Sequence, residues 1–412
     1  MSEAKEVVEI SKADPEVVSR IKNLSKTVPI VDTHNDFPYL LRGQLHYEFS
    51  SNGDFDFNHT TAHTDLTRLK EGGVGIQFFS CFIECQNEDR YSQDFNVPNS
   101  AVRDTLEQID SVKRLCADYE IAVVSNSEDA LKAFNEGKFV VTMGIEGLHQ
   151  VDISLSVLRL YYELGVRYAT LTHNGDNPFA TSVSSVTGGL EDKGLSKFGV
   201  ECVAEMNRLG MIVDISHVSD KTMKDTLKAT KAPVMFSHSS CYGVTPHPRN
   251  VSDEVLLLLK KNSGVICINF YNPFITQSES GEATIEDAAD HIAHAINLVG
   301  WDYVGLGSDF DGCSSVPVGL EDVSKYPELI AKVLERTNGT DEDVAKLMGG
   351  NVMRVWKASE VVAASLSSQQ PNEANWEDRD WYVLGYGYPE LFPGALQLKE
   401  TKFRPTMSWE FL

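Results

Sequence analysis

The sequence is poor in positive charge: 36 Lys and Arg residues stand against 60 Asp and Glu residues among 412, a formal net charge of −24. A chain this acidic lacks the basic surface that nucleic acids and anionic membranes require, so neither is expected as a partner. No apolar stretch reaches the roughly 20 residues of a membrane span. The charge balance also disfavours two-metal nucleases and phosphodiesterases that act on polymeric phosphates.

Cysteine is scattered, with seven residues and no Cys-x-x-Cys pair. The odd count argues against a complete disulfide framework, and residues 1–26 contain no apolar core of a secretory signal. The C-terminal residues also lack the hydrophobic tail of a lipid-anchor signal. We therefore expect reduced thiols, no membrane anchor and a cytoplasmic location.

The sequence is rich in short apolar runs with many β-branched residues, separated by stretches in which apolar positions have helical spacing. Apolar strands that alternate with helices predict a parallel sheet covered on both faces, and eight units predict an α/β fold, a closed (β/α)₈ TIM barrel. A doubly wound open sheet is the alternative, although no Gly-x-Gly-x-x-Gly turn follows any run. The eight runs are 28–34, 73–82, 138–147, 166–174, 210–219, 232–240, 263–271 and 302–312.

An additional run at 120–126 is interpreted as a short strand that leads into the third unit. The barrel is expected to occupy residues 1–360, with an N-terminal helix that starts near Pro15. Residues 361–412 form an extension rich in proline, glycine and aromatic residues. We expect this extension to pack on the barrel or on a partner subunit, and a homodimer stays open.

Side chains that bind metals follow six of the eight runs. All strands of a parallel barrel end on the same face, so these side chains are expected to meet at its C-terminal mouth. Imidazole and carboxylate suit Zn²⁺, and also Mn²⁺, Fe²⁺ or Co²⁺. The set exceeds what one tetrahedral zinc ion needs, which favours two ions bridged by one carboxylate. The residues are His34, Asp36, Glu146, His173, His217, His238 and Asp309.

Arg249 follows the sixth run, in the proline-flanked segment TPHPRN at 245–250. A planar guanidinium matches a carboxylate through two parallel hydrogen bonds, so Arg249 is a candidate clamp for a substrate carboxylate. An ordinary surface arginine is the alternative. His149, three residues after Glu146, is expected to support the site without binding metal.

The motifs VDTHND, GIEGLH, LTHN, DISHVS, FSHSS, PRN, NFY and GSDFDG occur in the order and spacing of the renal or membrane dipeptidase family, a branch of the metal-dependent amidohydrolases. The sequence resembles that family over about residues 28–357. The resemblance implies a zinc-dependent dipeptidase in which a hydroxide bridging two Zn²⁺ ions attacks the peptide carbonyl. It further implies that His34 and Asp36 bind one ion, that His217 and His238 bind the second, and that Glu146 bridges them.

Three further residues match positions that act on the substrate in this family. His173 would contact the substrate and stabilise the oxyanion, and Arg249 would hold the terminal carboxylate. Asp309 would take the proton of the attacking water and pass it to the leaving amine. One departure concerns a disulfide of secreted mammalian members, because Cys85 matches one half while Gly175 stands at the partner's position.

Two other functions stay open. A hydrolase of cysteinyl-glycine conjugates, β-lactams or other small amides, in thiol or secondary metabolism, would use the same metal site. An inactive barrel that serves as a binding protein is disfavoured, because Asp36, Glu146 and Asp309 are all present.

Overall fold

The computed structural model describes residues 10–86 and 93–381. Each of the eight predicted runs contains one strand. These strands are β1 (Ile30–Asn35), β2 (Val74–Cys81), β4 (Val140–Glu146), β5 (Val166–Thr170), β6 (Ile212–Asp214), β7 (Met235–Phe236), β8 (Val265–Ile268) and β9 (Val304–Leu306). The additional run contains β3 (Ala122–Val123), which is the short strand expected before the third unit.

The strands form one parallel sheet in the order β2-β1-β9-β8-β7-β6-β5-β4-β3. Because β2 also pairs with β4, from Ile76 opposite Val140 to Cys81 opposite Ile145, eight strands close into a ring. The remaining strand, β3, lies outside the ring beside β4. The predicted (β/α)₈ barrel is confirmed, and the open-sheet alternative is wrong.

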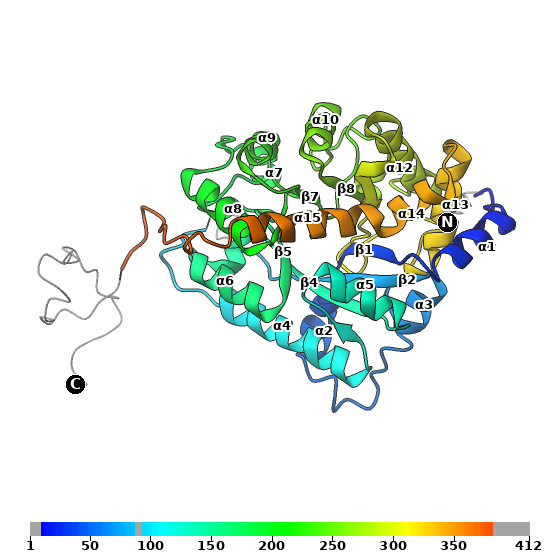
Figure 1. The fold of residues 1–412 in the computed structure, drawn as a ribbon, viewed down its shortest axis with the longest axis horizontal. Helices are drawn as coiled ribbons and strands as arrows, with labels where there is room; N and C mark the ends of the chain where they lie inside the picture. The colour runs from blue at the N-terminus through cyan, green and yellow to red at the C-terminus, as the bar shows by residue number, and fades with distance from the viewer. Residues whose placement is uncertain (1–9, 87–92, 382–412) are drawn as a thin grey trace, which may run out of the picture.

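Helices surround the barrel (Figure 1). Several begin at a serine that ends the preceding loop, such as Ser154, Ser219 and Ser252, whose hydroxyls accept a backbone N–H of the first turn. The longer helices are α1 (Pro15–Leu24), α2 (Phe37–Leu45), α4 (Ala101–Asp118), α5 (Ser127–Asn135), α6 (Leu155–Leu164), α8 (Lys197–Leu209), α9 (Asp220–Ala229), α10 (Asp253–Asn262), α12 (Ile285–Val299), α13 (Tyr326–Arg336) and α15 (Asn351–Ser365). Shorter ones are α3 (Leu66–Glu71), α7 (Val183–Thr187), α11 (Asn272–Ile275) and α14 (Asp341–Ala345).

The helix α15, orange in Figure 1, crosses in front of the barrel strands in that view. Its residues Val352 and Trp356 pack in one buried cluster with residues at or near the starts of strands, including Val140 and Val265. The Trp356 ring lies 5.3 Å from that of Phe78 inside the barrel. The N-terminal end of the barrel is therefore closed by apolar packing, which leaves the C-terminal mouth open to substrate.

The expected boundary at residue 360 lies inside α15, which continues to Ser365. Residues 366–381 follow without helix or strand. Asn372 is held between two barrel helices: its backbone N–H donates to Glu205 (3.1 Å), and its carbonyl accepts from Arg159 (2.9 Å). The rest of the extension, 382–412, lies outside the described residues. In the described ranges, no helix is long and apolar enough to cross a bilayer.

Candidate metal centre

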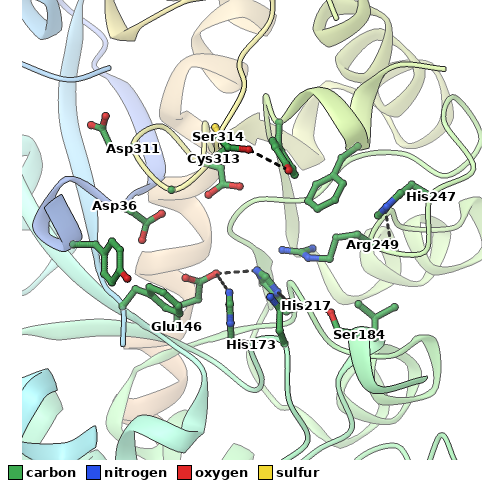
Figure 2. Close-up of a pocket in the computed structure, with 18 of the residues that line it drawn as sticks. Asp36, Glu146, His173, Ser184, His217, His247, Arg249, Asp311, Cys313 and Ser314 are labelled. Atoms are coloured by element: carbon green, nitrogen blue, oxygen red, sulfur yellow. Dashed lines mark hydrogen bonds and ion pairs between the residues drawn. The ribbon is translucent and has the colours of Figure 1, made fainter. Parts of the chain in front are cut away.

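The predicted site residues gather at the C-terminal mouth of the barrel, around a cavity of about 610 Å³. Figure 2 shows Asp36 and Arg249 on opposite sides of this cavity, with Glu146 and His217 between them. Six of the eight candidates line the cavity, and the other two, His34 and His238, lie beneath it with 0% and 1% of their surface exposed.

Four site residues lie two or three positions past the strand that leads to them: His173, His217, His238 and Asp309. The backbones of His217 and Asp309 are left-handed, each with φ of 65°. Residues other than glycine adopt this conformation at some cost, and they do so preferentially at functional sites. The loops beyond the strands therefore set the direction of these two side chains.

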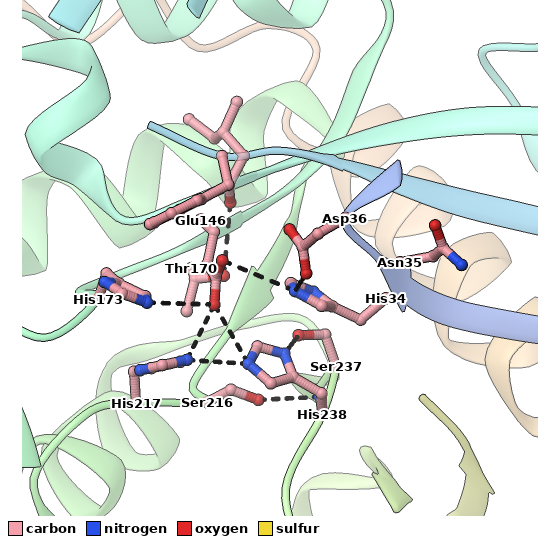
Figure 3. A network of polar contacts seen from close by, with 12 residues as sticks. His34, Asn35, Asp36, Glu146, Thr170, His173, Ser216, His217, Ser237 and His238 are labelled. Atoms are coloured by element: carbon pink, nitrogen blue, oxygen red, sulfur yellow. Dashed lines mark hydrogen bonds and ion pairs between the residues drawn. The ribbon is translucent and has the colours of Figure 1, made fainter. Parts of the chain in front are cut away.

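Glu146 stands at the centre of the site, at the end of β4 (Figure 3). Its Oε1 lies 2.8 Å from Nε2 of His217 and 3.2 Å from Nε2 of His238. Its Oε2 faces the other way, 3.6 Å from Nε2 of His34. Nε2 of His173 is 3.9 Å from Oε1. Oε1 thus faces His217 and His238 while Oε2 faces His34, as the two oxygens of a bridging ligand would.

Two further carboxylates, those of Asp36 and Asp309, lie near His34. Asp36 Oδ2 is 3.2 Å from Nε2 of His34. Single donor atoms of His34, Asp36 and Asp309 lie within 4.8 Å of one another. A Cβ at Gly312 would stand 2.2 Å from Asp36 Oδ2 and 2.7 Å from Asp309 Oδ1, so the close approach of this loop requires glycine.

Each of three central histidines has a hydrogen-bond partner at Nδ1, which turns Nε2 toward Glu146. The partners are Tyr168 Oη for His34 (2.9 Å), Ser237 Oγ for His238 (2.8 Å) and Asn174 Oδ1 for His217 (3.3 Å). Our sequence interpretation missed all three partners. Ser237 precedes the predicted ligand His238 and Asn174 follows the predicted substrate residue His173, so both positions offered a usable signal, whereas the sequence around Tyr168 offered none.

The phenol of Tyr168 reaches His34 because β4 carries glycine at position 144. A Cβ at Gly144 would lie 2.0 Å from Cζ of the Tyr168 ring. The ring therefore occupies the space of a missing side chain, and both residues are buried.

The electrostatics of the site are dominated by burial and by close carboxylates. Burial lowers the pKa of His34, but the charges of Asp36 and Glu146 outweigh it and raise this pKa to about 10. Burial raises the pKa of Glu146 to about 7; the charge of His34 opposes the shift and that of Asp36 adds to it. Burial likewise raises the pKa of Asp309 well above its ordinary value. Buried carboxylates that hold protons this tightly indicate a site suited to a cation.

The donor set fits divalent metal ions. Nε2 of His34 and Oδ1 of Asp36 are buried and make no hydrogen bond within the described residues. Nε2 of His217 lies 2.9 Å from Nε2 of His238. Burial and the charge of Arg249, among other groups, lower the pKa of both histidines well below the ordinary value, so both rings are neutral. Two neutral rings with lone pairs directed at one region are typical of metal ligands.

Arg249 is buried, with 4% of its surface exposed, so the surface-arginine alternative is wrong. Nη1 donates to Ser239 Oγ (3.1 Å), and Nη2 donates to Nε2 of His238 (2.8 Å). The guanidinium lies 5.7 Å from the centre of the Phe274 ring. Burial lowers the Arg249 pKa to about 10, so the side chain remains a cation at neutral pH.

His149 lies outside the ligand set. Its Nε2 lies 2.6 Å from the carbonyl of Ile83, and its Nδ1 lies 3.6 Å from Sγ of Cys85. These contacts are consistent with the supporting position expected for it. All seven cysteines lie in the described residues and are free thiols, Cys85 included.

Comparisons with known proteins identify the family of the chain. A family model described as membrane dipeptidase, peptidase family M19, matches residues 18–370. An uncharacterized dipeptidase of Schizosaccharomyces pombe is 58% identical over 388 residues, which cover 92% of this chain and 93% of the relative.

Two solved structures share the fold. The probable dipeptidase PvdM from Pseudomonas aeruginosa has a TM-score of 0.74 at 21% identity, over 85% of this chain and all of that chain. A metallopeptidase from Rhodobacter sphaeroides, liganded with a phosphinate mimic of the dipeptide L-Ala-D-Ala, has a TM-score of 0.68 at 26% identity. That match covers 81% of this chain and 99% of the other.

Proposed function

The chain belongs to the membrane dipeptidase family, peptidase family M19, and on that basis we propose that it hydrolyses dipeptides with a free C-terminal carboxylate at a centre of two Zn²⁺ ions. The enzyme is a metal-dependent dipeptidase; the metal, its number and the specificity are our proposal. The observation that carries it is the position of Glu146, whose Oε1 faces His217 and His238 and whose Oε2 faces His34.

In this proposal His34 and Asp36 hold one ion, His217 and His238 hold the second, and Glu146 bridges both. Mn²⁺, Fe²⁺ and Co²⁺ suit the same ligands. Metal bound by these residues would lower the pKa of a bound water and polarise the scissile carbonyl. The remaining residues bind the substrate and move protons.

Asp309 acts as the general base and acid. It takes the proton of the attacking water on a carboxylate oxygen and returns it to the leaving amine nitrogen. Burial raises its pKa, which makes the carboxylate a stronger base than an exposed aspartate. His173 lies above Glu146 with 17% of its side chain exposed, and burial lowers its pKa, so it is a neutral N–H donor for the developing oxyanion.

Arg249 selects the substrate. A dipeptide has a carboxylate at one end and an ammonium group at the other, a short distance apart. The cavity has matching polarity, with the Arg249 guanidinium on one side and the Asp36 carboxylate on the other, and Asp309 also lines it. A buried guanidinium favours a carboxylate partner, because charge-assisted hydrogen bonds strengthen away from water. A free C-terminus next to the scissile bond satisfies this requirement.

We also propose a division of the chain into a barrel and a C-terminal extension, with the boundary moved from residue 360 to the end of α15 at Ser365. The free thiols support a reducing compartment, so the cytoplasm is the proposed location.

The proposal is tested by comparing a dipeptide with its C-terminal amide and with a tripeptide that extends it at the C-terminus. The metal-loaded enzyme should cleave the dipeptide and leave the other two nearly intact. Equal cleavage of the dipeptide and its amide would refute the carboxylate requirement and favour a hydrolase of general small amides. Cysteinyl-glycine and a β-lactam in the same panel test whether those amides are also substrates.

A further inference from the structure

We propose that Asp214 positions the metal ligand His238 through the hydroxyl of Ser237, and that this relay sets the affinity of one of the two metal positions. The inference rests on the proposed metal centre. It concerns residues that touch neither metal nor substrate and act only through the His238 ring.

Asp214 ends β6 and is completely buried. Its Oδ1 accepts the backbone N–H groups of Ser216 (3.0 Å) and Ser237 (2.9 Å). Its Oδ2 accepts the hydroxyls of Thr170 (2.5 Å) and Ser237 (2.6 Å). Four donors thus converge on one carboxylate, which fixes it firmly beside the strand end.

The hydroxyl of Ser237 makes two contacts, with Asp214 Oδ2 at 2.6 Å and with Nδ1 of His238 at 2.8 Å. A hydroxyl has one hydrogen, and the carboxylate can only accept it. Nδ1 of His238 must therefore carry a hydrogen and donate it to Ser237. This assigns the tautomer of His238 and leaves the lone pair on Nε2.

That lone pair points into the centre of the site. Nε2 of His238 is 3.2 Å from Glu146 Oε1 and 2.9 Å from Nε2 of His217. A carboxylate behind a ligating imidazole fixes its orientation and makes it a better donor to the metal. The partners behind His34 and His217 are a phenol and an amide oxygen, which carry no charge. His238 alone among these three rings has a carboxylate relay behind it.

The barrel contains a near copy of this arrangement that lacks the ring contact. Asp32 in β1 accepts the backbone N–H groups of His34 (3.2 Å) and Ser308 (2.9 Å) on Oδ1. Its Oδ2 accepts the hydroxyl of Ser308 (2.7 Å). This hydroxyl also contacts the His34 carbonyl and the Phe310 N–H, and the phenol of Tyr326 lies beside it. Ser308 is therefore a matched control: it has the same role at a strand end without touching a ligand ring.

The test compares Ser237→Ala with Ser308→Ala by competition between the protein and a chelator for Zn²⁺. Both variants lose a buried hydroxyl that is hydrogen-bonded to an aspartate. The melting temperatures of the two metal-free variants should therefore fall by similar amounts. Ser237→Ala should bind one of its two ions about 10–100-fold more weakly, the usual effect of losing such a partner. Ser308→Ala should keep both affinities. Equal affinities in the two variants would overturn the proposal.

A second measurement needs no variant. Nitrogen-15 NMR of histidine side chains in the metal-free wild-type protein should show His238 with hydrogen on Nδ1 and none on Nε2. Hydrogen on Nε2 would overturn the relay. Failure of the proposed function is a separate result, because it appears as a wild-type protein that binds no metal or cleaves no dipeptide.

Discussion

Nη2 of Arg249 lies 2.8 Å from Nε2 of His238, and Glu146 Oε1 lies 3.2 Å from the same nitrogen. A guanidinium and a metal ion would compete for this one lone pair. If His238 binds metal as proposed, Arg249 has to release it, and the guanidinium would then meet a substrate carboxylate in the cavity beside it.

This relationship leads to a prediction for Arg249→Ala. The variant should lose at least tenfold in kcat/KM on dipeptides, because a buried charge-assisted contact is worth on the order of 2–5 kcal/mol. Its Zn²⁺ affinity should equal or exceed that of the wild type, since a competing cation is removed. Steady-state kinetics and chelator competition measure the two effects.

The control for this variant is Arg354→Ala. Arg354 donates to the carbonyls of Gly264 (3.2 Å) and Asp302 (2.7 Å), near the starts of β8 and β9 at the far end of the barrel. Its loss should lower stability without changing dipeptide specificity. If Arg249→Ala loses metal, the arginine holds the centre together and is not a clamp.

Asp309→Asn should lower kcat by roughly 10²–10⁴-fold, the usual contribution of general acid–base catalysis. The amide keeps the size of the side chain and removes the base, so metal content should stay near normal. Asp311→Asn is the control, because Asp311 Oδ1 accepts the backbone N–H of His63 (2.7 Å) and has no catalytic role in this account. Metal analysis together with kinetics distinguishes a general base from a metal ligand. Loss of metal in Asp309→Asn would show that Asp309 is a ligand.

Metal binding should strengthen as the pH rises from 6 to 8. In the metal-free protein the pKa of Glu146 is raised to about 7, so below pH 7 this carboxyl holds a proton that a metal ion must displace. Below pH 7 this proton should weaken binding by up to about tenfold per pH unit, and the proton on His34, whose pKa is raised to about 10, should add a similar dependence across the whole range. Chelator competition at pH 6, 7 and 8 measures the effect, and an affinity independent of pH would contradict the position of Glu146 between the ions.

The seven cysteines should all titrate as free thiols in denatured protein without reductant. Cys81, Cys116, Cys202, Cys241 and Cys267 are buried, and each of the seven is unpaired in the structure. A deficit of two thiols would reveal a disulfide and argue against a reducing compartment.

The sequence predicted the barrel and the gathering of its polar residues because both depend on local patterns. Apolar runs between helices specify buried parallel strands, and parallel strands end on one face. Strand lengths were overestimated: the run at 210–219 contains only the three residues of β6, and that at 232–240 only the two of β7. The reason is Asp214, whose carboxylate takes the N–H groups of Ser216 and Ser237 that would otherwise continue the sheet.

Other features of the site depend on contacts between distant segments. The phenol of Tyr168 meets His34 across 134 positions, through space left by Gly144 in a third segment. The left-handed backbones of His217 and Asp309 arise from loop packing, which side-chain spacing does not reveal. The burial of Arg249 likewise follows from its contacts with His238 and Ser239.

The central claim is that two metal ions at this centre cleave a dipeptide, and a metal titration of stripped protein tests it most directly. Enzyme freed of metal by a chelator is titrated with Zn²⁺ while dipeptide hydrolysis and bound metal are measured together. The account predicts no hydrolysis without metal and a rate that rises until two ions are bound per chain. Full turnover with a single bound ion, or none with two, would contradict it.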